Sequence, residues 1–133
     1  MTSAPSRDPV DIARFSDMKL SDERLAAIEA LGWVTPTPIQ VQAIPAGLDG
    51  KDVVGIAQTG TGKTGAFMIP ALERIRAGEG LQVLALCPTR ELAQQVSDDS
   101  AALAKGTNIR NEAIFGGVGY APQIRERSPR LQK

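Results

Sequence analysis

Apolar residues recur at helical spacing near the beginning of the chain. Leu25, Ile28 and Leu31 are three residues apart, which places their side chains on one face of a helix. Ser21 is a suitable N-cap, because its hydroxyl can accept a bond from a free backbone N–H, and Gly32 is a suitable end. The spacing therefore predicts a helix between these two residues.

A second helix is predicted from Thr37-Pro38 to Leu48, because proline is well tolerated in the first helical turn. Pro45 lies inside this helix and is expected to kink it, since proline cannot donate the bond that the preceding turn would accept. The two helices would together cover residues 21–48.

The period changes after residue 50. Short apolar runs, typical of strands buried on both faces, occupy residues 53–57 (VVGIA) and 81–87 (LQVLALC), and a weaker strand is predicted over 109–115. Helices are predicted between them, over 63–76 and 90–104. Strands that alternate with helices of this length predict βαβ crossovers, hence an α/β fold with a parallel sheet and helices on both faces.

Composition narrows the range of functions. The chain has 133 residues with 15 basic and 15 acidic side chains, which suits one globular domain. The absence of histidine excludes a Ser/His/Asp triad, and the single cysteine, Cys87, excludes an internal disulfide. No apolar run is long enough to cross a membrane, and residues 1–14 lack the apolar segment of a secretory signal. These features favour a cytoplasmic protein.

The most informative segment is residues 57–64 (AQTGTGKT), between a predicted strand and a predicted helix. Gly60 and Gly62 let the backbone approach anionic oxygens closely, and the N–H groups that open the helix face the same ligand. Lys63 can contact β- and γ-phosphate oxygens, and the Thr64 hydroxyl can bind Mg²⁺. The segment predicts a phosphate-binding loop, with Ala57 where the general pattern has glycine.

Five features, in the expected order over residues 15–123, resemble the DEAD-box ATP-dependent RNA helicases. They are the loop AQTGTGKT, the segment GW with PTPIQ at residues 36–40, the segment PTRELA at 88–93, the doublet Gly116-Gly117 and the aromatic Phe15 upstream. The resemblance implies a RecA-like P-loop NTPase domain, incomplete here, over residues 15–133, after a flexible tail over 1–14. It also implies ATP and Mg²⁺ as cofactors, with catalytic roles for Lys63 and Thr64 and cofactor contacts from the residues Phe15, Gln40, Thr59, Gly60, Thr61, Gly62, Lys63 and Thr64.

Gln40 has two interpretations. Thr37-x-x-Gln40 is a capping box, in which the glutamine side chain accepts a bond from the Thr37 backbone N–H. Alternatively, its amide offers the donor and acceptor that match adenine N6 and N7. The resemblance implies the second role, and it implies that Phe15 stacks on the adenine ring, although Phe15 by itself would be an ordinary core aromatic.

The resemblance also implies that RNA is a partner, bound through its backbone and independently of sequence by Pro88, Thr89, Arg90, Gly116 and Gly117. The residues alone give simpler interpretations: Thr89 is a good N-cap, and the glycine doublet is a turn. Arg90, however, falls in the first turn of a predicted helix, where a cation opposes the helix dipole. A phosphate docked beside it would account for that placement.

Other family features have no counterpart in these residues. There is no apolar strand leading into Asp-Glu after residue 64, and no TPGR or Ser-Ala-Thr segment. We therefore expect no useful ATP hydrolysis or unwinding by the 133 residues alone, and low solubility from unpaired strands. The alternatives are a nucleotide- or RNA-binding remnant without catalysis, a non-functional truncation product, and an unrelated P-loop kinase or GTPase. The basic segment 124–133 (IRERSPRLQK) is expected to be a loose end.

Overall fold

The computed structural model describes residues 12–58, 60, 62–76 and 78–117. Its regular elements are a short 3-10 helix, η1 (Phe15–Asp17), and the helices α1 (Asp22–Ala30), α2 (Pro38–Leu48), α3 (Lys63–Glu73) and α4 (Arg90–Leu103). The first two long helices agree with the sequence prediction. The third and fourth begin where predicted, but they end before the expected residues 76 and 104.

The helix starts follow from their capping residues. The Ser21 hydroxyl accepts a bond from the Arg24 backbone N–H at 3.3 Å, and the Thr89 hydroxyl accepts one from the Leu92 N–H at 3.2 Å. These bonds satisfy N–H groups that have no partner inside a helix, so α1 and α4 begin directly after them.

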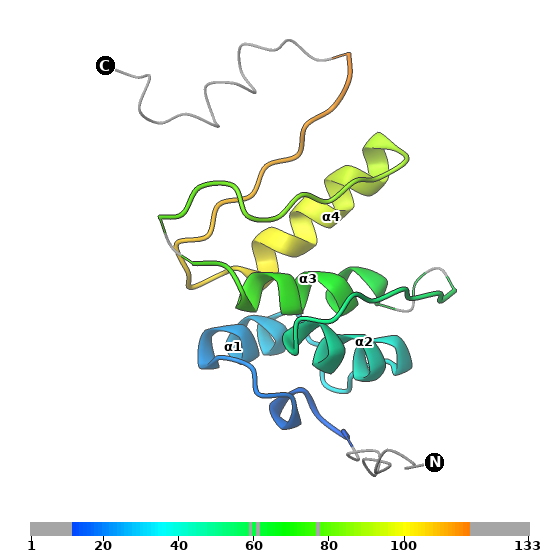
Figure 1. Cartoon of the computed structure of the whole chain (residues 1–133), viewed down its shortest axis with the longest axis vertical. Coiled ribbons are helices and arrows are strands. Elements are labelled where there is room, and N and C mark those ends of the chain that lie inside the picture. Colours follow the sequence, from blue (N-terminus) through cyan, green and yellow to red (C-terminus); the bar gives the residue numbers. More distant parts are fainter. Residues whose placement is uncertain (1–11, 59, 61, 77, 118–133) are drawn as a thin grey trace, which may run out of the picture.

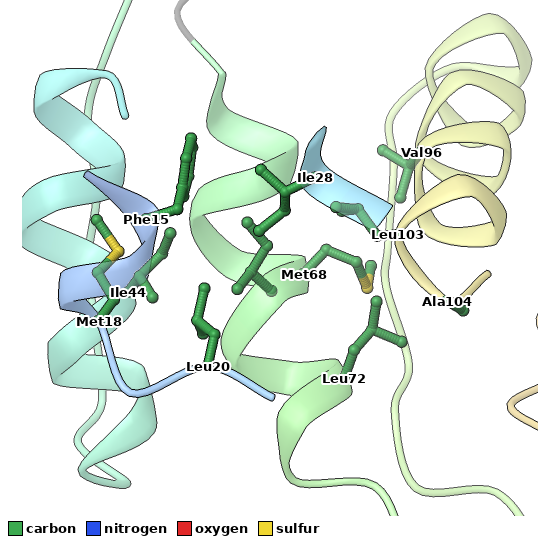
Figure 2. Packing of buried hydrophobic residues seen from close by; sticks show 11 residues of the cluster. Phe15, Met18, Leu20, Ile28, Ile44, Met68, Leu72, Val96, Leu103 and Ala104 are labelled. Atoms are coloured by element: carbon green, nitrogen blue, oxygen red, sulfur yellow. The ribbon is translucent and has the colours of Figure 1, made fainter. Parts of the chain in front are cut away.

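The core lies around α3. Figure 1 shows α3 across the middle of the molecule, with α1 and α2 on one side and α4 on the other. Figure 2 shows side chains from η1, α1, α2 and α4 meeting those of α3. Among the described apolar side chains, three are completely buried, and each comes from a different helix: Ile44, Ile69 and Leu103. Ile12, in the segment expected to be a tail, also packs against this cluster.

A buried ion pair ties three of the helices together. Arg24 of α1 is 2% exposed, and its Nε donates to Glu73 Oε1 at 3.0 Å, at the end of α3. Its Nη1 donates to the Leu103 carbonyl, at the end of α4. The Glu73 carboxylate also accepts bonds from the Ser21 backbone N–H and hydroxyl, at 3.1 and 2.8 Å. The buried Arg24 charge is thus compensated by the partly buried Glu73 carboxylate, as buried charges require.

The expected parallel sheet is not seen in the described part of the chain. Residues 53–57, 81–87 and 109–115 contain no strand, and Figure 1 draws them as extended segments that run beside the helices. A strand exists only when another backbone pairs with it, whereas a helix bonds to itself. The apolar side chains in these segments are correspondingly open: Val54 and Ile56 are each 93% exposed.

None of the helices in the described ranges is long and apolar enough to cross a membrane.

Candidate functional site

The predicted phosphate loop leads into the first turn of α3. Gly62 is the N-cap of α3 and has φ +79°, a conformation that L side chains rarely adopt. It has no side chain that could cap the helix, so the first N–H groups of α3 are open to an anion. Lys63 is exposed and Thr64 half-buried at that end. The predicted site residues Thr59 and Thr61 lie outside the described residues.

Gln40 joins the start of α2 to this loop. Its Oε1 accepts a bond from the Thr37 backbone N–H at 2.9 Å, which confirms the bond expected of a capping box. Its Nε2 donates to the Gly62 carbonyl at 3.2 Å, a contact across 22 residues of sequence that spacing could not reveal. A Cβ built on Gly62 would lie 2.6 Å from that nitrogen, so only glycine fits here. The segment that contains Gln40 and the phosphate loop therefore form one unit.

The remaining capacity of the Gln40 amide fits an adenine edge. A side-chain amide has two hydrogens and two oxygen lone pairs, and the bonds to Thr37 and Gly62 use one of each. Within the described residues, one donor and one acceptor are left, which is the pair that adenine N6 and N7 require. Gln40 is 2% exposed, so a base must displace the groups that cover it.

Two further side chains surround this junction. The Thr37 hydroxyl oxygen is buried without a hydrogen-bond partner within the described residues, and it would lie 3.2 Å from a Cβ on Gly62. The Trp33 ring packs closely against the first turn of α3: a Cβ built on Gly65 would lie 2.7 Å from Trp33 Cζ3. A buried polar atom and a tightly packed indole thus lie beside the predicted phosphate loop.

Phe15 lies in the core and not at an open surface. It is 4% exposed, and Figure 2 shows it beside Met18 and Ile44. Its position agrees with the simpler interpretation, an ordinary core aromatic. Stacking on adenine stays a prediction.

The larger cavity is distinct from this junction. It has a volume of about 570 Å³ and lies between α2, α3 and the segment that follows α2, with Ile39, Val53 and Phe67 among its mostly apolar lining residues. Of the predicted site residues that the structure describes, Lys63 alone contributes to it. Its lining makes it a gap between helices and an unpaired segment rather than a phosphate site.

Thr64, the predicted Mg²⁺ ligand, lies at this end of α3. No group of three or more His, Cys, Asp or Glu side chains that could hold a metal lies within the described residues. Mg²⁺ commonly keeps several waters and binds through substrate phosphates with one or two protein oxygens. The Thr64 hydroxyl fits that pattern as one protein ligand.

The second group of predicted residues meets at the beginning of α4. Pro88, Thr89 and Arg90 are exposed, and Arg90 Nη2 donates to the Gly116 carbonyl. The structure therefore brings together two predicted RNA-binding features that are 26 residues apart. Thr89 caps α4, as the simpler interpretation expected.

An acidic groove flanks this group. A cavity of about 530 Å³ runs along α4 from Arg90, with Glu91, Asp98, Asp99 and Phe115 in its lining. Burial raises the pKa of Asp99 above its usual range, and the neighbouring Asp98 carboxylate adds to the effect. An anionic ligand at Arg90 would therefore avoid this side of α4.

Comparison with known proteins identifies the family. The model of the DEAD/DEAH box helicase family matches residues 37–131. The chain belongs to this family. The DEAD-box ATP-dependent RNA helicase CshA of Streptococcus pneumoniae is 44% identical over 113 residues, which cover 84% of this chain and 22% of CshA.

Solved structures of DEAD-box proteins have the same fold. A DEAD box protein from the hyperthermophile Methanococcus jannaschii aligns with a TM-score of 0.83 and 39% identity, over 86% of this chain and 32% of its own. The RNA-helicase Prp28 from Chaetomium thermophilum, bound to ADP, aligns with a TM-score of 0.75 and 35% identity, over 84% of this chain and 28% of its own. The predicted RecA-like helicase fold is thus supported, and the chain spans about a third or less of each relative's length.

The sequence prediction missed the buried pair of Arg24 and Glu73. Helical spacing places Arg24 one residue before Leu25 of the apolar stripe, and an arginine there is ordinarily exposed. Glu73 lies 49 residues further on, and no local pattern relates the two.

Proposed function

We propose that this chain binds ATP with Mg²⁺ at the junction of α2 and α3, and binds the RNA backbone at the beginning of α4. In a whole helicase, these two sites would couple ATP hydrolysis to the opening of short RNA duplexes. The expected parallel sheet belongs to the same proposal: residues 53–57, 81–87 and 109–115 would pair when neighbouring strands are supplied.

The observation that carries the proposal is the bond between Gln40 and Gly62. It joins a side chain suited to read adenine to the loop suited to hold phosphates. An ATP molecule would span both parts, whereas a phosphate alone would use only the loop. Prp28, a relative with the same fold, is bound to ADP, which supports a nucleotide as the ligand proposed for this chain.

Each residue has a defined part in the proposed nucleotide site. Gly60, Gly62 and the first N–H groups of α3 would hold the phosphates, with Lys63 compensating their charge and Thr64 bound to Mg²⁺. Thr59 and Thr61 are assigned to the same loop by sequence. Phe15 would stack on adenine only if binding uncovers its ring.

Hydrolysis needs further groups. Mg²⁺ in phosphoryl transfer usually has an acidic protein partner, and an arginine finger can contribute about 10³–10⁵ in rate. We propose that these 133 residues by themselves bind nucleotide and RNA without useful catalysis. An unrelated kinase or GTPase is disfavoured by the family match over residues 37–131.

The test compares ATP with GTP. Trp33 is the only tryptophan in the sequence, and its ring lies against Gly65 in the first turn of α3. Its fluorescence can therefore report binding at the phosphate loop. The native chain should prefer ATP by about 5- to 150-fold, the value of one bidentate base contact. Gln40→Ala should lose this preference, and Lys63→Ala should weaken both nucleotides.

Gln42→Ala is the matched control, because Gln42 lies on the same helix and is exposed. It should keep the preference for ATP. Equal affinity of the native chain for ATP and GTP, or ATP binding that survives Lys63→Ala unchanged, would contradict the proposed nucleotide site.

A further inference from the structure

The segment after α4 turns back and runs along that helix. The Thr107 hydroxyl donates to the Ala104 carbonyl, and Asn111 Nδ2 donates to the Ser97 carbonyl at 2.6 Å. The Gly116 carbonyl then accepts its bond from Arg90, in the first turn of α4. These contacts fix the direction of the segment, which ends with Gly116 and Gly117 beside the beginning of the helix.

Arg90 lies close to both glycines of the turn. Arg90 Nη2 donates to the Gly116 carbonyl, and a Cβ built on Gly117 would lie 2.7 Å from the same nitrogen. Gly117 has φ +76°, so a side chain there would be strained even without Arg90. The turn is therefore shaped around the guanidinium group, which fills the space that a side chain at residue 117 would need.

We propose that Arg90 is a positioning residue of the RNA site: it holds the Gly116–Gly117 turn beside the N-terminus of α4. In this arrangement, the backbone of the turn and the free N–H groups of α4 face the same strand of RNA. The inference rests on the proposed function. It differs from a direct role, in which the Arg90 charge binds a phosphate and the turn keeps its place without it.

Salt dependence separates the two roles. A cation that neutralises a phosphate of a single strand contributes about 0.7 to the slope of log K against log salt concentration. A neutral backbone N–H releases no counterion. Loss of a positioning residue should therefore lower the affinity and leave the slope unchanged, whereas loss of a direct contact lowers both.

The experiment compares Arg90→Gln with Arg76→Gln in the full chain. Arg76 is exposed, and its ion pair with Glu79 is 4.0 Å long, so the control removes the same charge from an unrelated place. Backbone NMR relaxation of Gly116 and Gly117 is measured without RNA, and binding of a single-stranded oligouridine is measured over a range of salt. We expect Arg90→Gln to loosen both glycines and to weaken binding about 10- to 150-fold, the value of one hydrogen bond from a charged donor, at an unchanged slope.

A second pair of variants keeps the arginine. Gly117→Ala should push the turn away from Arg90 and weaken RNA binding at an unchanged slope. Gly106→Ala shares the strained backbone, at φ +83°, but its Cβ would meet nothing within 4 Å, so RNA binding should be retained.

The measurements distinguish failure of the role inferred for Arg90 from failure of the proposed RNA binding. Unchanged relaxation of the two glycines in Arg90→Gln overturns the inference, and so does a loss of about 0.7 from the slope. If the native chain binds no RNA, the proposed RNA function fails, and with it the role assigned to Arg90 in binding. The relaxation of the turn would then still show whether Arg90 holds it.

Discussion

Similar apolar side chains are buried in the helical region and exposed in the extended segments. Ile69 of α3 is fully buried, whereas Ile56, in the segment just before the phosphate loop, is 93% exposed. Leu103 at the end of α4 is fully buried, whereas Leu84, in the segment before α4, is 75% exposed. Composition does not explain the difference, since both regions are rich in aliphatic residues.

The difference comes from how each region satisfies its backbone. A helix pairs its own N–H and C=O groups, so α1 to α4 are free to pack wherever their apolar faces meet. An extended segment has no such internal pairing, so it needs a partner strand before its backbone can be buried along its length. The helices thus form a core among themselves, and they hold the phosphate loop and the turn at Gly116 in place.

We expect the largest loss of stability when the buried ion pair of the helical region is broken. Glu73→Ala should leave the Arg24 charge buried and unpaired, which costs about 3–5 kcal/mol in the free energy of unfolding. Glu79→Ala is the matched control, because its exposed pair with Arg76 is worth no more than about 1 kcal/mol. Urea unfolding followed by circular dichroism measures both, and equal costs would show that Arg24 is not buried in solution.

The next prediction compares one substitution in the two regions. Ile69→Thr should cost about 2–4 kcal/mol, because it removes buried apolar volume and introduces a hydroxyl without a partner. Ile56→Thr should stay within about 0.5 kcal/mol, as exposed substitutions usually do. If the two variants are equally destabilised in urea, residues 53–57 are packed in solution and the contrast between the regions is wrong.

Self-association gives Ile56→Thr a second readout. Exposed apolar segments with unpaired backbone favour pairing between chains. Sedimentation velocity at increasing concentration should show less association for Ile56→Thr than for the native chain.

The helices could be predicted because their signals are local. Ser21, Thr89 and Pro38 mark three helix starts, and each is confirmed. The three apolar runs predicted strands, but a run specifies only that a segment suits a sheet, and the partner strands decide whether it forms one. The described part shows extended segments without pairing.

In the candidate site, too, the local features could be predicted and the contacts between them could not. Sequence patterns identified Gln40, the phosphate loop and the segment at Arg90 as separate features. The bonds that join them, from Gln40 to Gly62 and from Arg90 to Gly116, link residues 22 and 26 positions apart. Such contacts depend on how the helices pack, which no local spacing encodes.

We expect the smallest change in stability from the ionisation of Asp99, which is partly buried on α4. The pKa of Asp99 is raised in the native state, first by burial and second by Asp98. The native state therefore holds this proton more tightly than the unfolded chain does. The stabilisation is complete below the ordinary aspartate pKa of about 3.9 and is lost as pH rises through the higher native value.

Asp99→Asn cannot ionise, so it should remove this loss and raise stability at pH 7 by less than about 0.5 kcal/mol. Asp98→Asn keeps an oxygen that can accept the 2.9 Å bond from Gln94, and it relieves only the repulsion. Urea unfolding between pH 3 and pH 7 should therefore show a larger change for Asp99→Asn than for Asp98→Asn. If Asp98→Asn removes the whole pH dependence, repulsion is the main cause, and this side of α4 is as open to water as the segments that flank it.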